Sequence, residues 1–316
     1  MNLDFLITEL GVIIYATLLY TPPLLFASLG SCFSEVSGVV NIGIEGMMTA
    51  GAFTGCVVAY FTGSPWLGFL CGGLAGALFG ALHALATVRL DADQTISGTA
   101  INFLAPGIAI MMAKSMFSST DTIPLPAASK IPLLFNGLFD TTTTVGTFLK
   151  NVFTNYATTY LAFIAVAVVW FVFYKTRFGL RMRACGEHPQ ACETLGINVL
   201  RTRFLCVTIS GFLSGLGGAC VTMAITNQFR PISIVGQGFI AIAAVIFGKF
   251  RPQGAMLGCL LFGFCTGLKV VLGSSNLISA QLISLIPYVV TVLVLILFVG
   301  KSHVPAANGK PYIKSK

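Results

Sequence analysis

Long apolar segments separated by short polar connections follow one another along almost the whole chain. A helix crosses the hydrocarbon core of a bilayer with about 20 consecutive apolar residues. With that length as the criterion, the pattern predicts membrane spans near residues 10–30, 46–62, 66–88, 96–114, 157–174, 204–226, 235–248, 254–272 and 281–299. The sequence therefore predicts an all-α fold, a polytopic transmembrane helical bundle of about 8–10 spans that forms a single domain over residues 1–316.

Two of the predicted spans, 46–62 and 235–248, are short for a full crossing and are bordered by glycine and polar residues. Irregular backbone is tolerated at membrane depth only where protein or a water-filled cavity covers it. Short, glycine-interrupted segments in corresponding places of two halves also point to a transport path. The pattern thus predicts broken or re-entrant helices beside such a path.

Composition supports the membrane assignment. The chain is 56% hydrophobic and only 9% charged, whereas soluble domains carry roughly 25% charged residues, and this excludes a soluble enzyme. The net charge of +8 lies in short connections rather than on a polar domain, so no nucleic-acid partner is expected. The nine cysteines mostly stand alone inside apolar segments and form no CxxC pair, so neither a metal site nor a disulfide framework is predicted.

Basic residues indicate the orientation. The connection 175–203 holds six Lys or Arg residues, the tail 301–316 holds four, and the link 249–253 holds Lys249 and Arg251. Alternation of the spans puts these three regions on one side, which the positive-inside rule assigns to the cytoplasm together with the C-terminus. The loop 115–155 is then outside. No Lys or Arg precedes Arg89, so the side of the N-terminus stays open.

Glycines repeat every four residues within two of the predicted spans. These are Gly72, Gly76 and Gly80 in one span, and Gly211 and Gly215 in another. Small residues at this spacing lie along one helix face and allow helices to pack closely in lipid. The pattern predicts packing seams.

A polar segment, residues 35–46, interrupts the apolar pattern early in the chain. Two carboxylates, Glu35 and Glu45, and the amide of Asn41 lie in otherwise apolar surroundings, where a charge is costly unless it is paired. Three glycines in the segment permit backbone that a regular helix does not need. Either the segment belongs to a transport path, or it is an ordinary cytoplasmic turn with solvated carboxylates.

A second polar segment, residues 91–102, leads into the fourth predicted span. On a helix, Gln94, Ser97 or Gly98, and Asn102 fall near one face. Such a stripe could hydrogen-bond a polar solute, or it could bond neighbouring helices. The carboxylates of this segment have no second polar cluster or metal ligands to work with, so catalysis is not expected.

A third informative segment lies in the basic connection, at residues 174–197. Pro189 suits the first position of a short helix, and Gly196 is well placed to end it. Ala191, Leu195 and Ile197 offer apolar contacts. The segment predicts a short amphipathic helix that binds either a partner protein or the anionic surface of the membrane.

At these residues the sequence resembles the permease subunits of the branched-chain amino acid, simple sugar and nucleoside group of ABC importers. Residues 37–48 and 51–53 are similar to the N-terminal signature of that group. Residues 96–102 and 234–254 resemble the nucleoside branch, which works with basic membrane lipoproteins. Residues 183–197 resemble the loop that docks on the ATPase, although Gln190-Ala-Cys-Glu193 is a degenerate form of its usual pattern. The resemblance implies ATPase-coupling residues at Arg183, Glu187, Ala191 and Gly196.

The resemblance also implies the partners and the location. They are an ABC ATPase subunit, a second permease (homologous or identical), an extracytoplasmic substrate-binding lipoprotein and the membrane lipid, in the plasma (inner) membrane of a prokaryote. The chain has no G-x-x-x-x-G-K-[ST] loop, so ATP hydrolysis is expected on a separate ATPase chain. We therefore expect no enzyme activity and no cofactor on this chain, with ATP and magnesium on the partner ATPase.

The implied solute is nucleoside-like, either a nucleoside or riboflavin. We hypothesise a solute path along Asn41, Glu45, Gln94 and Asn102, with Phe239 supplying an aromatic face. A nucleobase has a π-face and hydrogen-bonding edges that such residues can meet. The alternative is an ion-coupled secondary transporter of a small polar solute, because broken helices and buried carboxylates also suit ion coupling. Dependence of uptake on ATP, rather than its collapse with an ionophore, separates the two.

Overall fold

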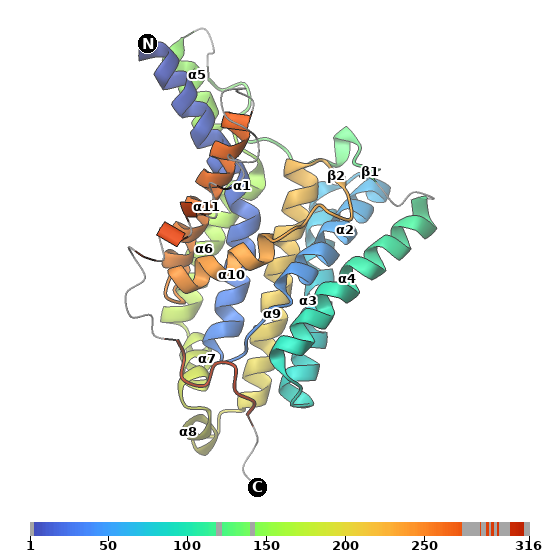
Figure 1. Cartoon of the computed structure of the whole chain (residues 1–316), viewed down its shortest axis with the longest axis vertical. Coiled ribbons are helices and arrows are strands. Elements are labelled where there is room, and N and C mark those ends of the chain that lie inside the picture. The colour runs from blue at the N-terminus through green and yellow to red at the C-terminus, as the bar shows by residue number, and fades with distance from the viewer. Residues whose placement is uncertain are drawn as a thin grey trace.

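The computed structural model describes residues 3–117, 122–139, 143–273 and 304–312, together with isolated residues between 285 and 296. Most of these residues lie in helices (Figure 1). The helices are α1 (Leu3–Val36), α2 (Ile44–Thr62), α3 (Pro65–Ala84), α4 (Gln94–Phe117), α5 (Thr144–Phe153), α6 (Ala157–Lys175), α7 (Arg177–Glu187), α8 (Pro189–Thr194), α9 (Val199–Cys220), α10 (Gln237–Phe247) and α11 (Pro252–Gly273). The π-helical turns η1 (Leu85–Arg89) and η3 (Val221–Ile225) extend α3 and α9, and η2 (Ala127–Ser129) is a 3₁₀ turn. The only described sheet pairs β1 (Ile123–Pro124) with β2 (Gln228–Phe229) in antiparallel orientation.

Seven of the described helices are long and apolar enough to cross a membrane, and α10 is a shorter apolar helix of 11 residues. This confirms the predicted all-α, polytopic fold. The prediction of a short crossing is right for 235–248 and wrong for 46–62, because α2 has 19 residues and qualifies as a span. The irregular backbone lies before α2, at residues 37–43, rather than within it. The predicted span 281–299 lies largely outside the described residues.

The sequence pattern did not predict two of the described helices, α5 and α7. The predicted outer loop 115–155 contains α5, whose N-terminal amides are capped by the Thr143 hydroxyl, which accepts from Gly146 N at 3.1 Å. The search for long apolar segments did not find α5, because this helix is short and amphipathic. Gly11 of α1 packs against its Phe148 and Asn151 side chains, so α5 lies beside the start of α1.

The predicted glycine seams meet each other in the centre of the bundle. A Cβ built on Gly76 would lie 2.2 Å from the carbonyl oxygen of Gly211, and one on Gly215 would lie 2.4 Å from that of Gly72. The backbones of α3 and α9 are therefore in direct contact. Helix α2 joins them, because a Cβ on Gly218 would lie only 1.8 Å from the carbonyl oxygen of Met48. Close backbone approach of this kind is the main way that helices gain packing energy in lipid.

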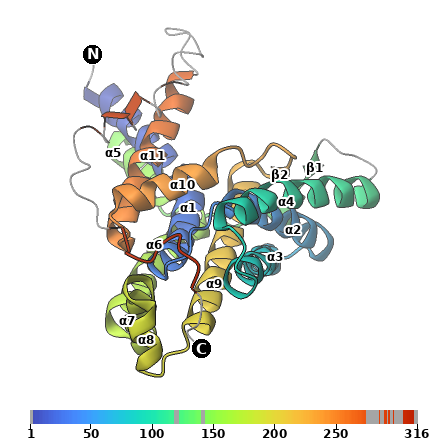
Figure 2. The same cartoon turned by 60° about the horizontal axis from the view of Figure 1, so that its bottom comes forward.

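The basic regions gather at one end of the bundle. Figure 1 shows α7, α8 and the C-terminal tail at the end opposite to the N-terminus and α5. Figure 2 turns this end towards the viewer and shows the tail passing close to α7, α8 and the start of α9. The turn between α10 and α11, with Lys249 and Arg251, faces Lys175 at the end of α6 across a common groove. The described parts of the three basic regions are thus on one side, as the sequence predicts.

Candidate functional site

The first candidate site surrounds the break between α1 and α2. Helix α1 ends at Val36, Gly38 takes a left-handed conformation (φ 92°), and α2 begins at Ile44. Most residues of the break are buried. Its backbone is bonded by a side chain at Val40, whose N–H donates to Gln94 Oε1 at 2.7 Å. The side-chain Nδ2 of Asn41 donates to Ser210 Oγ at 3.0 Å. Irregular backbone here is covered by protein, as membrane depth requires.

Asn102 of α4 bonds the backbone where the break ends and α2 begins. Its side-chain Oδ1 accepts from Gly46 N at 2.8 Å, and its Nδ2 donates to the carbonyl of Ile42 at 3.0 Å. With Gln94, it uses its amide to fasten α4 to this backbone. The sequence analysis gave two roles for the polar stripe of α4, solute binding or bonding to neighbouring helices. In this conformation the stripe has the second role.

Glu45, at the start of α2, links the break to α10. Its carboxylate accepts hydrogen bonds from the backbone N–H groups of Gly236 and Gly238, the latter at 2.7 Å. These amides form the N-terminus of α10, where the helix dipole favours a negative charge. Gly236 itself is left-handed (φ 75°). Glu45 therefore acts as a cap of α10 supplied by another helix.

Phe239 lies in the first turn of α10, with a side chain that is 50% exposed. The structure thus brings Asn41, Glu45, Gln94 and Asn102 together around the break, while the Phe239 ring points to the outside of the described bundle. Within the described residues, one polar atom of the group, Asn41 Oδ1, is buried without a hydrogen-bond partner.

His83 is a member of this site that the sequence analysis missed. It is fully buried on α3. Its Nε2 lies 3.1 Å from the carbonyl of Val40, and its Nδ1 lies 3.0 Å from Ser97 Oγ. Because a carbonyl only accepts, a neutral imidazole in this position carries its proton on Nε2, and its Nδ1 accepts from the Ser97 hydroxyl. An isolated histidine inside an apolar span was the available signal.

The second candidate site is the coupling region, made of α7 and α8. Pro189 opens α8 and Gly196, left-handed with φ 77°, follows its end, as the sequence predicts. Ala191 and Leu195 are exposed, and Leu195 is 79% accessible. The opposite face of α8 is anchored by a small apolar cluster of Cys185, Cys192, Val199 and Tyr312. Burial, with the neighbouring Cys192, raises the pKa of the Cys185 thiol to about 12, so the thiol stays protonated.

Two further predicted coupling residues lie on α7. The Arg183 guanidinium lies over the Tyr174 ring, 5.1 Å from its centroid. The Glu187 carboxylate accepts from Ala306 N of the tail at 3.3 Å. Arg183 therefore anchors α7 to the end of α6, and Glu187 anchors it to the tail.

The coupling region touches the break directly. A Cβ built on Gly186 of α7 would lie 2.1 Å from the carbonyl oxygen of Val36, the last residue of α1. The same end of α1 carries Glu35, whose Oε2 accepts from Asn308 Nδ2 of the tail at 2.6 Å. A movement of α7 therefore reaches the end of α1, directly before the break, without an intervening element.

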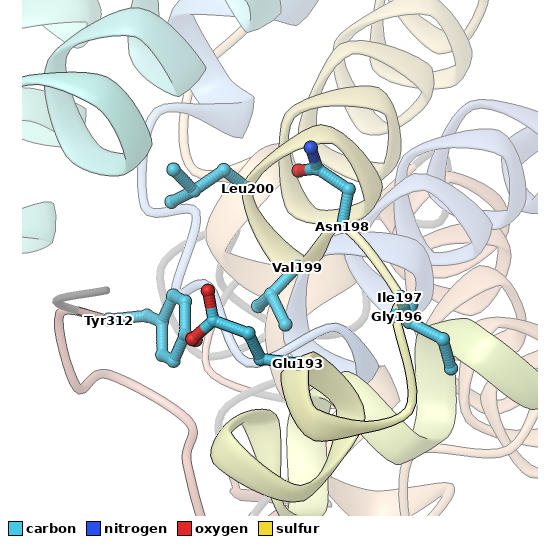
Figure 3. Close-up of a pocket in the computed structure, with 7 residues that line it drawn as sticks. All are labelled: Glu193, Gly196, Ile197, Asn198, Val199, Leu200 and Tyr312. Atoms are coloured by element: carbon cyan, nitrogen blue, oxygen red, sulfur yellow. The ribbon is translucent and has the colours of Figure 1, made fainter. Parts of the chain in front are cut away.

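The tail 304–312 connects the coupling region to the bundle through hydrogen bonds. No sequence signal indicated this role. Ala307 N donates to the carbonyl of Gly186 at 2.9 Å, and Arg203 of α9 donates to the carbonyl of Lys310 at 3.1 Å. Figure 3 shows the ring of Tyr312 beside the Glu193 carboxylate of α8, to which its hydroxyl donates a hydrogen bond. These two residues line a cavity of about 220 Å³. The contacts join residues more than one hundred positions apart, which is why sequence patterns do not reveal them.

We expect Tyr312→Phe to loosen the tail, because it removes a hydrogen bond to a carboxylate, worth about 1.5–3 kcal/mol. Hydrogen exchange of the 304–312 amides, followed by mass spectrometry, should be roughly tenfold faster or more in the variant. Tyr60→Phe, at an exposed ring on α2, is the matched control and should leave this exchange unchanged. Unaltered exchange in Tyr312→Phe would show that the tail does not depend on this bond.

The same bond predicts a pH dependence. Burial and the adjacent Glu193 carboxylate raise the pKa of Tyr312 to about 12, above the ordinary value of about 10. A raised pKa of an acid means that the neutral phenol is favoured by the folded state, so its contribution is complete below pH 10. That contribution is lost as the pH rises from about 10 through about 12. Protection of the tail should fall in this window.

Seven candidate spans, a protein-covered break between two helices and a short helix displayed at the basic end define a polytopic membrane protein of the transport permease class. Residues 13–298 match the family described as branched-chain amino acid transport system / permease component. The chain belongs to that family.

Individual relatives are similar along almost the whole chain. The nucleoside ABC transporter permease protein NupC of Lactococcus lactis subsp. cremoris (strain MG1363) is 42% identical, over 98% of this chain and 99% of its own. The guanosine ABC transporter permease protein NupQ of Bacillus subtilis (strain 168) is 44% identical, over 97% of this chain and 98% of its own. A guanosine ABC transporter permease protein from the same bacterium, NupP, is 25% identical over 89% of this chain and 79% of its own.

Proposed function

We propose that this chain is a membrane-spanning permease subunit of an ATP-driven ABC importer for a nucleoside-like solute. The observation that carries the proposal is the 42–44% identity, over nearly full length, to permeases named for nucleoside and guanosine transport. The basic end of the bundle, with the tail and α8, faces the cytoplasm in this proposal, because positively charged connections stay on that side. A nucleoside is favoured over riboflavin by the names of these relatives.

The mechanism follows from the contact between the coupling region and the break. An ATPase subunit that binds α8 and changes shape on ATP binding displaces α7, whose Gly186 lies against Val36. The displaced end of α1 moves the break, and the break carries Asn41, which is bonded to α9. Glu45 then transmits the movement to α10 through its two backbone hydrogen bonds. Rearrangement of α2 and α10 opens and closes the solute path in this scheme.

The solute path remains a proposal for Asn41, Glu45, Gln94, Asn102 and Phe239. In the conformation described, the first four hold the break in place, so a solute would bind them only in a conformation in which some of these bonds have opened. Phe239 is exposed here and offers its ring without such a change. A path needs only weak contacts, because the solute must also leave it.

Docking of the ATPase on α8 is supported by the exposed apolar pair Ala191 and Leu195, which lies at the basic end where a soluble partner can reach it. ATP and magnesium would be held by that partner. A central apolar anchor commonly carries much of the binding energy of an interface.

We expect Leu195→Asp to reduce recovery of the ATPase with this chain by about tenfold or more, because a charge replaces an apolar anchor that the interface buries. Leu138→Asp is the matched control, because Leu138 is also strongly exposed, at 71%, and lies in the 122–139 segment away from α8. Quantitative co-purification is the measurement. Equal recovery with both variants would remove α8 from the docking surface.

A second permease and a substrate-binding lipoprotein complete the proposed importer. Bacillus subtilis has two relatives of this chain that carry guanosine permease names, one of similar length and one longer. This supports a pair of different permeases, in which the present chain is the shorter one. The lipoprotein would deliver the solute to the end of the bundle opposite α8.

The test is affinity purification of this chain from its native membrane, followed by identification of the co-purified chains and an uptake assay with labelled guanosine and uridine. Recovery of an ATPase, a second permease and a lipoprotein, with ATP-dependent uptake, supports the proposal. If the chain is recovered alone and ATP-free liposomes still take up solute until an ionophore is added, the secondary-transporter alternative replaces it.

A further inference from the structure

A wide groove opens at the basic end of the bundle, between the end of α6 and the turn that joins α10 to α11. Its volume is about 730 Å³. Its walls combine three cationic side chains with three aromatic rings and contain no carboxylate. The lining residues are Trp170, Tyr174, Lys175, Phe247, Gly248, Lys249, Arg251, Gln253 and Gly254.

Two of the cationic side chains, Lys249 and Arg251, are directed outward by an unusual turn. Lys249 and Phe250 both adopt left-handed backbone, with φ of 53° and 59°, which costs energy for residues other than glycine. Gly248 packs so tightly on α11 that a Cβ there would lie 2.2 Å from Ala255 N. The Phe250 side chain is buried and holds the turn in place. As a result, Lys249 and Arg251 are exposed on the groove side.

The three cationic side chains of the groove form no ion pair with any residue that the structure describes. Among the described residues, no carboxylate lies within ion-pair distance of Lys175, Lys249 or Arg251. The N-terminus of α11 adds to the positive potential, because the first amides of a helix have no intrahelical acceptor and Gln253 and Gly254 line the groove. This is a set of donors suited to a phosphodiester group.

The surroundings of the groove are those of a membrane interface. Trp170 and Tyr174 lie in the last turns of α6, where aromatic side chains are enriched at the level of lipid headgroups. On the same helix, Ile164, Val168 and Phe171 are all more than half exposed. With Lys175 they follow the spacing of one helix face, so an apolar track leads from the groove into the bilayer.

The geometry points to a binding site for an anionic phospholipid, whose phosphodiester lies among Lys175, Lys249 and Arg251 while its acyl chains follow the exposed face of α6. A free phosphate would meet the same cations but would leave the apolar track unused, so the lipid is the better occupant. Basic pockets between membrane helices on the cytoplasmic side bind such headgroups. This site is independent of the transported solute, and it would fix the α10–α11 turn against α6.

The test uses Trp170 as the reporter. The chain has two tryptophans, so the full chain with Trp66→Phe, in phosphatidylcholine vesicles, reports on the groove alone. Brominated phosphatidylglycerol should quench Trp170 with a relative affinity about tenfold above that of brominated phosphatidylcholine. The variant Lys175→Gln/Lys249→Gln/Arg251→Gln should abolish the preference. Lys175→Arg/Lys249→Arg, which keeps the charge, and Lys114→Gln/Lys130→Gln/Lys150→Gln, which removes three charges elsewhere, should retain it.

Three outcomes would overturn the inference. Equal quenching by the two lipids in the Trp66→Phe chain would show that no selective headgroup site exists. Loss of the preference when inorganic phosphate is added would assign the groove to a free anion. Loss of the preference when the purified ATPase subunit is added would assign the turn to protein docking. None of these outcomes bears on the proposed nucleoside transport, because the experiment does not measure uptake.

Discussion

Gly218→Ala should be the most damaging single-methyl change in the described bundle. The added Cβ would lie 1.8 Å from the carbonyl oxygen of Met48, and neither backbone can yield without separating α2 from α9. Adding a methylene to a tightly packed interior commonly lowers the free energy of unfolding by about 1–3 kcal/mol. Because the added Cβ would meet backbone, we expect a loss at the upper end of this range or beyond it. We expect the apparent melting temperature of the detergent-solubilised chain to fall by several degrees or more, with reduced yield of monodisperse protein.

The matched control is Gly107→Ala. Gly107 lies inside α4 and a Cβ there would meet no atom within 4 Å. Alanine is favoured over glycine in a helix interior by about 0.5–1 kcal/mol, so this variant should be neutral or slightly more stable. A Gly218→Ala chain as stable as Gly107→Ala would contradict the direct backbone contact of α2 and α9.

Glu45→Leu should abolish most uptake while leaving the coupling region able to bind its ATPase. The substitution leaves the N–H groups of Gly238, which is buried, and of Gly236, which is partly buried, without their acceptor. An unpaired amide costs about 1–3 kcal/mol when it is fully buried. The start of α10 should then loosen, which hydrogen exchange at residues 236–238 would detect. We expect the initial rate of nucleoside uptake to fall by at least about tenfold.

Glu45→Gln separates the capping role from ion coupling. A glutamine keeps one oxygen acceptor for α10, so a cap predicts partial activity between the wild type and Glu45→Leu. An ion-coupling carboxylate would instead lose its function equally in both variants. Glu9→Leu, at the far end of α1, is the control for loss of a carboxylate and should retain uptake. Full activity of Glu45→Leu would sink the assignment of Glu45 to the link between α2 and α10.

The role of Glu45 illustrates what a sequence pattern can and cannot predict. A carboxylate in an apolar segment indicates that a partner must exist, because an unpaired charge there is too costly. It does not indicate which partner. Gly238 is 193 positions away along the chain, and a glycine N–H carries no signature in the sequence. The sequence analysis therefore identified Glu45 but not its contact with α10.

Gln94 and Asn102 show the same limit in another form. Their spacing correctly places both near one face of a helix, since residues on a helix repeat every 3.6 positions. Whether that face meets a solute or irregular backbone depends on where the break lies, and α4 is placed against it only by the packing of the whole bundle. For His83 the sequence pattern gave only a weak indication of a role in the site. For the tail residues Asn308 and Tyr312 it gave none.

Sequence alone determined the solvent and hence the class of fold. Hydrophobic segments of bilayer length force helices, because no other element satisfies every backbone group in lipid within one segment. The basic connections, the glycine seams and the bounds of α8 also follow from local rules, since each depends on residues close together in the chain.

Tertiary structure alone decided how these parts communicate. It placed Gly186 on the end of α1, seated the tail between Glu35 and Glu193, made Glu45 the cap of α10 and gathered three cationic side chains beside Trp170. Each of these contacts joins segments remote in sequence, and each is worth little until the others hold the backbone in place. Such cooperative contacts cannot be summed from local preferences, because their geometry exists only once the helices have packed.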